Sequence, residues 1–326
     1  MSRLRVALLG CGGVARRHAD AVAALPHDLE LVACCGRDAR RTAAFAGRHG
    51  ASAYTDVDEM LRVERPDLVI VTLPPFARGD LVQRVARAGV HLLVEKPLAL
   101  DVRSAELMAE AARAAGVVAA VGFMYRFGDA VRAWDEADAG RVGLFVGSYH
   151  CNSLHASWWR EEAKSGGQVV EQAIHLIDLV RHLMGDPDSV YARRSNLAHR
   201  STPGYDIEDV SAAIFGWDDG RIATLNASNI AVPGVWDKRW EVYAERMTGR
   251  FTGWNEAVLS RTDGEGEVLE IAGTTDPFVA QLADLHRAIA AGSRPRVPLE
   301  EGVAALRLAL AARRSADERR EVRLGP

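Results

Sequence analysis

The sequence predicts an α/β protein that begins with a doubly wound parallel sheet and continues into an α+β domain with a mostly antiparallel open sheet. Through residue 122, short apolar runs alternate with helical patterns, which is typical of βαβ units covered on both faces. Beyond that point longer strand-like runs follow one another with one isolated helix, which is typical of an antiparallel sheet. A chain of 326 residues also exceeds what one hydrophobic core usually supports. We therefore expect a dinucleotide-type domain over residues 1–122 and a second domain over residues 123–326.

The composition and charge narrow the class of protein. With 48% hydrophobic and 26% charged residues, the chain has the composition of an ordinary globular protein. The net charge of -4 and a pI near 6.2 argue against a nucleic-acid partner, because a nucleic-acid-binding protein needs a basic face to neutralise phosphates. The sequence shows neither a secretory signal pattern nor an apolar run long enough to span a membrane, so we expect a cytoplasmic protein with no membrane partner.

The expected elements of the first domain alternate in type. Each expected strand is a short run rich in Val, Leu and Ile, and each expected helix has apolar residues at helical spacing. The strands are residues 4–9, 29–34, 68–71, 92–94 and 117–121, and the helices are residues 14–25, 38–48, 76–88 and 102–115.

The expected elements of the second domain are mostly strands. They are residues 144–151, 189–197, 210–217, 222–228 and 240–244, with one helix over residues 170–184. Two further helices are expected near the C-terminus, at residues 276–291 and 299–316, and these could pack on either domain.

A glycine-rich turn stands where the first strand ends and the first helix begins. It reads Gly10-Cys11-Gly12-Gly13-Val14-Ala15, which fits the GxGxxG/A fingerprint of Rossmann domains with Ala15 in the third position. Gly10 permits a tight turn, and Gly12 lets the backbone approach a pyrophosphate at the helix N-terminus. Since βα repetition surrounds the turn, we predict a dinucleotide site that includes Gly13 and Val14.

The end of the second strand bears on which dinucleotide is bound. An NAD-specific site places an acid there for the ribose 2′-hydroxyl, but this chain has Gly36 followed by Arg37. Arg37, helped by Arg41, could instead pair with a 2′-phosphate, so NADP(H) is favoured. Alternatively Arg37 is a surface residue and Asp38 only caps the next helix, which leaves NAD(H) open.

The third strand ends in Thr72-Leu73-Pro74-Pro75. The prolines stop the strand and stiffen a loop at the carboxyl edge of the sheet, where ligands of open α/β sheets bind. We therefore expect Thr72, Leu73 and Pro74 to flank the cofactor.

The cysteines indicate neither a disulfide framework nor a metal site. Cys11, Cys34, Cys35 and Cys151 show no CxxC spacing and no accompanying ligand cluster. We expect buried free thiols and no bound metal.

Several motifs together resemble the Gfo/Idh/MocA oxidoreductase family. Besides the glycine turn and the Thr-x-Pro-Pro loop, they are Val94-Glu95-Lys96-Pro97, the segment Val121-Gly122-Phe123-Met124-Tyr125-Arg126-Phe127, and Gly166-Gly167 leading to His175 and Asp178. The resemblance implies that Glu95 and Lys96 lie beside the cofactor and that Lys96 also meets the substrate. An ammonium there could orient a hydroxyl and stabilise developing alkoxide charge.

The same resemblance points to an acid–base pair in the second domain. The family often has Asp-x-x-x-His where this chain has Glu171-Gln172-Ala173-Ile174-His175, and positions i and i+4 of a helix share a face. His175 is the candidate acid or base because an imidazole titrates near neutral pH. Glu171 is one methylene longer than the usual aspartate. Asp178 is expected to orient the imidazole or to form an ion pair within the fold.

Polar and aromatic residues in segments that the family folds around its active site are candidates for substrate binding. Their mix suits a polyhydroxylated ring, which needs hydrogen bonds at its edge and an apolar face. They are Tyr125, Arg126, His155, Trp158, Trp159 and Arg160.

The predicted activity is therefore an NAD(P)-dependent dehydrogenase or reductase that transfers a hydride to or from a secondary alcohol or ketone of a sugar, cyclitol or related polyol. Lys96, Glu171 and His175 are its candidate catalytic residues. A dinucleotide-binding sensor with little catalysis is the alternative, and a cofactor that stays bound through turnover is also open. By family analogy we expect a homo-oligomer, a dimer or a tetramer.

Overall fold

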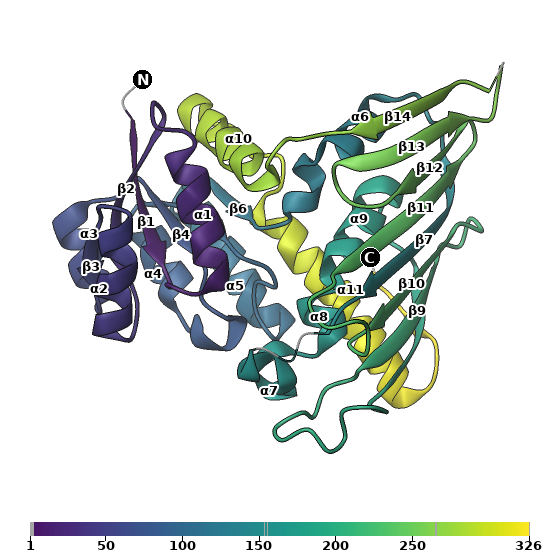
Figure 1. Cartoon of the computed structure of the whole chain (residues 1–326), viewed down its shortest axis with the longest axis horizontal. Coiled ribbons are helices and arrows are strands. Elements are labelled where there is room, and N and C mark those ends of the chain that lie inside the picture. The colour runs from purple at the N-terminus through teal and green to yellow at the C-terminus, as the bar shows by residue number, and fades with distance from the viewer. Residues whose placement is uncertain (1–2, 153, 155, 265, 326) are drawn as a thin grey trace. The chain divides into compact units, whose positions relative to one another are not determined.

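The computed structural model describes residues 3–152, 154, 156–264 and 266–325. The chain forms two compact units, shown in Figure 1. The first comprises Met1–Met124 and Asp276–Val303, and the second comprises Tyr125–Thr275 and Ala304–Pro326. Each unit has its own sheet and core.

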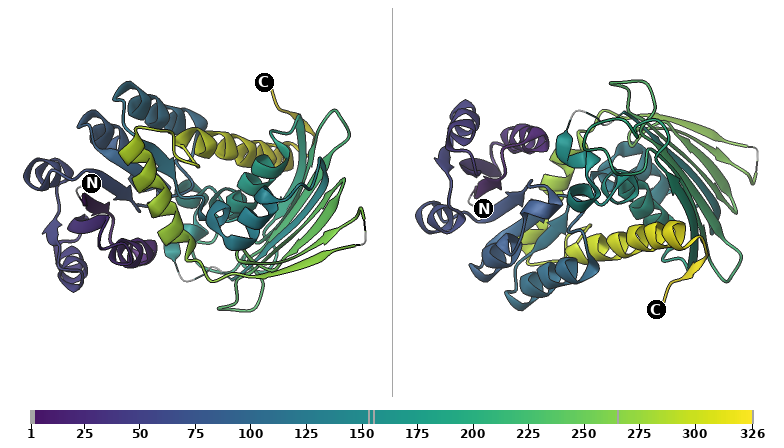
Figure 2. Two further views of the ribbon diagram at one scale, coloured as in Figure 1. Left: turned by 90° about the horizontal axis from the view of Figure 1, so that it is seen from above. Right: turned by 90° about the horizontal axis from the view of Figure 1, so that it is seen from below.

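The first unit contains a six-stranded sheet in the order β3-β2-β1-β4-β5-β6, with every neighbouring pair parallel. The strands are β1 (Leu4–Leu9), β2 (Leu29–Cys35), β3 (Ser52–Tyr54), β4 (Leu68–Val71), β5 (His91–Val94) and β6 (Ala119–Val121). The central strand β4 is buried along its whole length, because helices lie on both sides of the sheet (Figure 2). The predicted parallel α/β sheet is confirmed.

The helices of the first unit follow the predicted alternation, with two differences. They are α1 (Gly13–Ala23), α2 (Ala39–Arg48), α3 (Val57–Glu64), α4 (Leu81–Arg87), α5 (Val102–Ala114) and α10 (Pro277–Ala291), with a 3₁₀ turn η1 (Pro75–Ala77). Helix α3 and strand β3 were not predicted, since β3 is a three-residue strand without an apolar run. The helix expected over residues 76–88 is divided into η1 and α4, because Gly79 adopts a φ of 49° between them.

The second unit contains a nine-stranded sheet in the order β14-β13-β12-β11-β7-β10-β9-β8-β15, in which, among the strands that the structure describes, only β7 and β10 pair in parallel. The predicted, mostly antiparallel sheet is confirmed. Its strands are β7 (Val142–His150), β8 (Ser189–Ser195), β9 (Val210–Gly216), β10 (Ile222–Ser228), β11 (Asp237–Ala244), β12 (Met247–Phe251), β13 (Glu256–Arg261), β14 (Val268–Ala272) and β15 (Val322–Arg323). The last four were not predicted, because they are short or carry charged residues.

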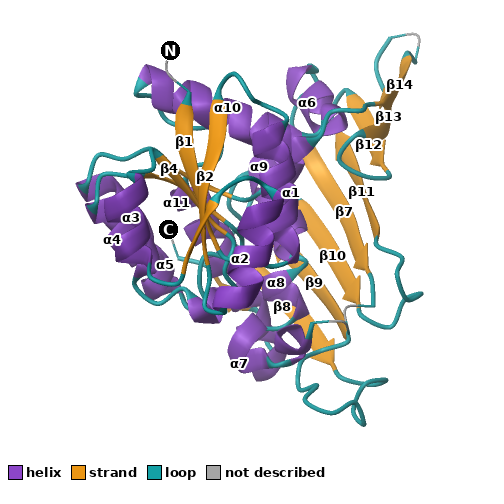
Figure 3. Ribbon diagram, turned by 60° about the vertical axis from the view of Figure 1, so that its left-hand side comes forward, coloured by secondary structure: helices purple, strands orange, loops and turns teal. Residues whose placement is uncertain are grey.

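Helices cover one face of this sheet. Figure 3 shows α8 (Gln168–Glu171) and α9 (Ile174–Met184) against the strands, and α6 (Asp129–Glu136) lies near β13 and β14. Side chains alternate accordingly: Phe145 and Tyr149 of β7 are buried, whereas Val146 is 37% exposed on the other face. The remaining helical segments are η2 (Met124–Phe127), η3 (Ser157–Arg160), α7 (Glu162–Ser165) and α11 (Leu299–Glu318). The first residues of α11, up to Val303, belong to the first unit.

The prediction of one continuous helix over residues 170–184 was wrong. Helix α8 ends at Glu171 and α9 begins at Ile174. At the break the Ala173 N–H donates to the carbonyl of Gln168, five residues back, at 3.0 Å, and the His175 N–H points to the carbonyl of Gln172 at 3.4 Å. Glu171 and His175 therefore do not occupy one turn of a regular helix, and the argument from i and i+4 spacing does not apply to them.

Among the helices that the structure describes, none is both long and apolar enough to span a membrane.

Candidate active site

The glycine turn forms an open cradle at the start of α1. Gly10 has a φ of 109°, and a Cβ there would lie 2.7 Å from Oγ1 of Thr72, so only glycine fits. At Gly12 and Gly13 a Cβ would meet nothing within 4 Å, which leaves room over the helix N-terminus for a ligand. Gly12 caps the helix without any side-chain hydrogen bond. The N–H groups of the first turn can therefore bind a pyrophosphate, so the residues present fit a dinucleotide.

The Thr72-Leu73-Pro74 loop adjoins this turn. Thr72 is buried, and its hydroxyl donates to the carbonyl of Gly10 at 3.0 Å. Ala15 is fully buried beneath the turn, while Val14, Leu73 and Pro74 are half-buried. The structure thus brings the predicted cofactor residues of the first and third strands together.

Two exposed arginines follow β2: Arg37 lies just after the strand, and Arg41 lies in the first turn of α2. A Cβ at Gly36 would lie 2.6 Å from Oγ1 of Thr42, so an acidic side chain does not fit at that position. Asp38 caps α2 by accepting from the Arg41 N–H at 3.0 Å, as the alternative interpretation of this segment predicted. This bond uses only the backbone of Arg41, and both arginines remain exposed near the strand end.

A buried imidazole–carboxylate contact lies beneath the Glu95-Lys96-Pro97 segment. Oε1 of Glu95 is 2.8 Å from Nε2 of His18 on α1, and both side chains are buried. Burial pushes the pKa of Glu95 upward, but the hydrogen bond and charge of His18 and the charges of Lys96 and Arg78 leave that pKa below its usual value. Gly122 packs on the same carboxylate, since a Cβ there would lie 2.9 Å from Oε2. Glu95 therefore holds the segment in place, and Lys96 beside it is half-buried.

The sequence did not reveal Arg78 as a residue of this region. Its side chain is 1% exposed, and its guanidinium donates to the carbonyls of Leu73 at 3.0 Å, of Leu98 at 2.8 Å and of Pro97. One buried cation thus joins the loop after β4 to the loop after β5. In sequence Arg78 resembles its surface neighbours Arg84 and Arg87, so no local signal could have identified it.

The second unit holds the imidazole of His175. Its ring stacks on Tyr125, with centroids 4.5 Å apart and planes inclined by 5°, and both side chains are buried. Burial raises the pKa of Tyr125 well above its usual value, although a hydrogen bond with Tyr149 opposes this rise. A neutral phenol therefore fixes the plane of a ring that can exchange a proton.

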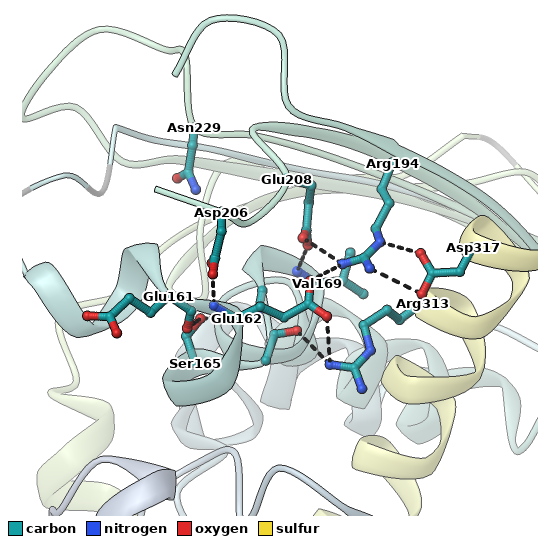
Figure 4. A network of polar contacts seen from close by, with 12 residues as sticks. Glu161, Glu162, Ser165, Val169, Arg194, Asp206, Glu208, Asn229, Arg313 and Asp317 are labelled. Atoms are coloured by element: carbon teal, nitrogen blue, oxygen red, sulfur yellow. Dashed lines mark hydrogen bonds and ion pairs between the residues drawn. The ribbon is translucent and has the colours of Figure 1, made fainter. Parts of the chain in front are cut away.

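An extended polar network anchors the chain before Glu171 (Figure 4). Glu208 is buried, and its Oε1 accepts from the Val169 N–H at the start of α8 at 2.8 Å. Arg194 donates to Glu208 at 3.3 Å and to Glu162 at 2.8 Å, and it pairs with Asp317 at 2.8 and 3.1 Å. Burial raises the pKa of Glu208, while the Val169 N–H and Arg194 favour its charged form. The short helix that carries Glu171 is thereby fixed at its first turn.

Arg126 and Asp178 form a buried bidentate ion pair. Their nitrogens and oxygens are 2.9 and 2.6 Å apart, and the side chains are 6% and 0% exposed. Burial raises the pKa of Asp178, and the guanidinium opposes that rise. Of the two roles expected for Asp178, the structure shows the ion pair within the fold, and Arg126 is its partner.

The remaining substrate candidates lie on and around η3. Trp158 and Trp159 are half-buried, and their rings meet edge to face at 5.5 Å. Arg160, also half-buried, donates to the carbonyl of Leu154, and His155 lies outside the described residues.

Cys34, Cys35 and Cys151 are buried and Cys11 is half-buried, all four as free thiols. Searching the residues that the structure describes finds no group of His, Cys, Asp and Glu able to hold a metal ion.

Two family models match the chain. An oxidoreductase family with an NAD-binding Rossmann fold matches residues 4–123, and the C-terminal domain of the same GFO/IDH/MocA group matches residues 127–249. The chain belongs to the Gfo/Idh/MocA oxidoreductase family. The glycine cradle and the stacked His175 thus lie within the two matched parts of a Gfo/Idh/MocA protein.

Known relatives extend over nearly the whole chain. The myo-inositol 2-dehydrogenase of Thermotoga maritima is 26% identical, covering 98% of this chain and 98% of its own. The D-xylose 1-dehydrogenase (NADP(+)) 2 of Haloferax volcanii is 26% identical, covering 92% and 93%. The structure of levoglucosan dehydrogenase with NADH and L-sorbose is 20% identical with a TM-score of 0.90, covering 100% of both chains, and shows the shared fold.

Proposed function

We propose that this oxidoreductase transfers a hydride between a nicotinamide cofactor and a secondary alcohol or ketone of a sugar, cyclitol or related polyol. Lys96 orients the substrate hydroxyl, His175 exchanges its proton, and Glu171 hydrogen-bonds a further hydroxyl. The nicotinamide, when bound, supplies the hydride acceptor or donor. The chain's own task is to position the carbinol and to move its proton.

The observation that carries this proposal is the environment of His175. A buried imidazole stacked at 4.5 Å on Tyr125 has a fixed ring plane. An imidazole can accept a carbinol proton as the hydride leaves, or return it in the reverse reaction. The relatives named for myo-inositol and D-xylose support a polyol as the substrate.

Turnover tests the proposal. The purified protein is incubated with NADP(+) or NAD(+) and with myo-inositol, D-xylose or levoglucosan, and formation of the reduced nicotinamide is followed by absorbance. We expect at least one polyol to be oxidised and Lys96→Ala to lose most of kcat. An unchanged rate in Lys96→Ala would refute the role of Lys96, and tight cofactor binding without any turnover would favour the sensor alternative.

We also propose that NADP(H) is preferred, with NAD(H) as the alternative. Gly36 leaves no acid for the ribose 2′-hydroxyl, and the exposed Arg37 and Arg41 offer charge to a 2′-phosphate. Fluorescence titration with NADPH and NADH measures the preference. In Arg37→Ala the preference should collapse, whereas in the control Arg40→Ala, on the same exposed segment, it should persist. Equal binding of both dinucleotides, unchanged in Arg37→Ala, would mean that Arg37 is only a surface residue.

We further propose that the protein forms a homo-oligomer through the uncovered face of the nine-stranded sheet. Large apolar side chains line this face and are between 37% and 59% exposed: Val146, Tyr191, Ile214, Ile222, Val258 and Val268. Such a patch on a regular sheet suits a self-complementary interface between two copies.

A further inference from the structure

Two thiols from neighbouring strands meet beside the glycine turn of the first unit. Cys34 of β2 is fully buried and pairs in register with Leu8 of β1, and Cys11 follows the end of β1 by two residues. The thiols of Cys11 and Cys34 share a hydrogen bond. They are therefore neighbours in the fold, although helix α1 lies between them in sequence.

The backbone after β2 shows on which face of the sheet the thiols meet. The Gly36 N–H donates to the carbonyl of Tyr54 at 3.0 Å, so the chain stays extended past β2, and Cys34 and Gly36 point to the same face. A Cβ at Gly36 would lie 3.5 Å from Sγ of Cys11. The Cys11 sulfur thus lies over the face that carries the Cys34 thiol, whereas Cys35 points to the opposite face.

The two thiols differ in exposure and in acidity. Cys11 is half-buried just before the N-terminus of α1, whereas Cys34 is fully buried. The hydrogen bond with Cys34 lowers the pKa of Cys11 to about 7, although burial opposes this, and the same bond raises the pKa of Cys34. In redox-sensing pairs, a partly accessible thiolate is oxidised first and a neighbouring thiol then captures the oxidised sulfur.

We propose that Cys11 and Cys34 form a reversible disulfide that weakens the binding of the dinucleotide at the glycine turn. Cys11 is the sulfur that a peroxide oxidises, and Cys34 resolves the product. This inference rests on the cofactor binding that the proposed function requires, and it adds redox control to that function.

The oxidation consists of two steps. The Cys11 thiolate attacks one oxygen of hydrogen peroxide, the O–O bond breaks, and the products are the sulfenic acid of Cys11 and hydroxide. The Cys34 sulfur then attacks the Cys11 sulfur, the S–O bond breaks, and the Cys34 proton leaves with the sulfenic oxygen as water. The peroxide thereby takes up two electrons from the pair of thiols. A dithiol returns both thiols by thiol–disulfide exchange.

The disulfide moves the turn more easily than it moves the strand. Its sulfur atoms lie about 2.05 Å apart, well inside hydrogen-bond distance, so one partner has to move toward the other. Cys34 is held by the ladders to both neighbouring strands, beside Leu8 of β1 and Ala53 of β3. The turn is less constrained, because a Cβ at Gly12 or Gly13 would meet nothing within 4 Å. Oxidation therefore displaces the N–H groups that bind the pyrophosphate.

The disulfide and the cofactor oppose each other by thermodynamic linkage. A disulfide that weakens dinucleotide binding is itself disfavoured by the same factor when the dinucleotide is bound. Bound NADPH should therefore protect the thiols, and peroxide should act on the protein that has lost its cofactor.

Peptide mass spectrometry tests the disulfide directly. The reduced protein is treated with hydrogen peroxide, remaining thiols are blocked with N-ethylmaleimide, and the chain is digested with trypsin. Cleavage after Arg16 and Arg17 places Cys11 and Cys34 on different peptides, so the disulfide is detected as a linked pair that dithiothreitol separates. We expect this pair in wild type, and less of it when NADPH is present. Peptides that remain unlinked after peroxide treatment would overturn the disulfide.

Substitutions assign the bond, because Cys34 and Cys35 share one tryptic peptide. Cys35→Ser is the matched control: Cys35 is also buried at the end of β2 but points away from Cys11, so the linked pair should persist. Cys34→Ala should abolish the pair and leave the sulfenic acid of Cys11, which dimedone traps. NADPH binding by reduced Cys34→Ala guards against a folding defect. A linked pair that persists in Cys34→Ala would overturn the proposal.

Fluorescence titration measures the effect of the disulfide on cofactor binding. Peroxide-treated wild type should bind the preferred of NADPH and NADH about tenfold or more weakly than reduced wild type, within the usual range of coupling between two sites. Dithiothreitol should restore the affinity. Equal affinities of the disulfide-linked and the reduced protein would overturn the redox control.

Turnover of the same samples separates this inference from the proposed function. Reduced protein that oxidises a polyol but forms no disulfide would refute the redox control alone. A disulfide that weakens cofactor binding in a protein without polyol turnover would refute the activity alone. Failure of the reduced protein to bind either dinucleotide would overturn both.

Discussion

The thiol of Cys11 stands inside the glycine turn that would receive the pyrophosphate. A hydrogen bond with Cys34 lowers the pKa of Cys11 to about 7, burial opposes this, and Thr42 and Arg41 lower it further. The same hydrogen bond raises the pKa of Cys34. The reactivity of the Cys11 thiol should therefore report whether a ligand occupies the turn.

Alkylation of Cys11 should follow this pKa. The thiolate fraction rises with pH through about 7, so the rate of reaction with iodoacetamide should reach half its maximum near that pH. Saturating NADPH should slow the reaction by covering the turn. Peptide mass spectrometry measures the modification, and Cys11→Ser provides the control. A midpoint near pH 9, or a rate that NADPH does not change, would contradict the described environment of this thiol.

At the residue scale, the sequence predicted which residues are candidates for the site better than it predicted the partners with which they pack. The glycines of the turn, Lys96 and His175 could be predicted as site residues because their motifs are local. Arg126 was predicted as a substrate residue, but the structure shows it paired with Asp178 in the core. Burial of an arginine depends on partners far away in sequence, so no local pattern distinguishes Arg78 from a surface arginine.

At the scale of elements, the turn at Gly166 and Gly167 determines where α8 begins. Gly167 has φ 92° and ψ 172°, a conformation that is essentially restricted to glycine. A Cβ there would lie 2.5 Å from Oε2 of Glu208. Since the Val169 N–H and Arg194 fix that carboxylate, it cannot move aside at low cost.

Gly167→Ala should therefore destabilise the protein more than a matched substitution does. Gly185 has nearly the same conformation, φ 78° and ψ -177°, but a Cβ there would meet nothing within 4 Å. Gly185→Ala should cost about 1–3 kcal/mol of unfolding free energy from strain alone, and Gly167→Ala roughly 1–3 kcal/mol more from overpacking. Urea unfolding measures both, and equal losses would refute the anchoring role of Glu208.

The elements also show which sequence signals were sufficient. Strands β9 and β10 were predicted because each is a longer strand-like run, whereas β14 has the sequence Val-Leu-Glu-Ile-Ala with mostly exposed side chains. The break between α8 and α9 could not be predicted from the sequence, because apolar residues continue across it at helical spacing. The contact of Glu208 with the start of α8 joins segments about 40 residues apart, beyond the reach of a local pattern.

At the scale of the whole molecule, the nine-stranded sheet has one face that the described helices leave uncovered. Alternation along its strands predicts two unlike faces, and the exposed one carries several large aliphatic side chains among its polar ones. Sequence alternation alone could not show this, because it does not say which apolar residues face the helices.

Ile214→Glu should dissociate the proposed oligomer. Ile214 is 50% exposed on β9, the third strand from the β15 edge of the uncovered face, and a buried unpaired carboxylate would cost several kcal/mol in an interface. Sedimentation analysis should show a smaller species than wild type. Leu107→Glu on α5, where the leucine is 38% exposed, is the control and should leave the size unchanged. A wild-type monomer, or an oligomer indifferent to Ile214→Glu, would refute the interface.

The most direct test of the proposed activity is the transfer of a labelled hydride. The protein is incubated with NADP(+) and polyols deuterated at their carbinol carbons, and the reduced nicotinamide is analysed by mass spectrometry, including any cofactor that remains bound. We predict deuterium on the nicotinamide ring in wild type and its loss in His175→Asn with cofactor binding retained. A cofactor that binds tightly but remains oxidised and unlabelled with every polyol would contradict the proposed activity and identify a dinucleotide-binding protein without this chemistry.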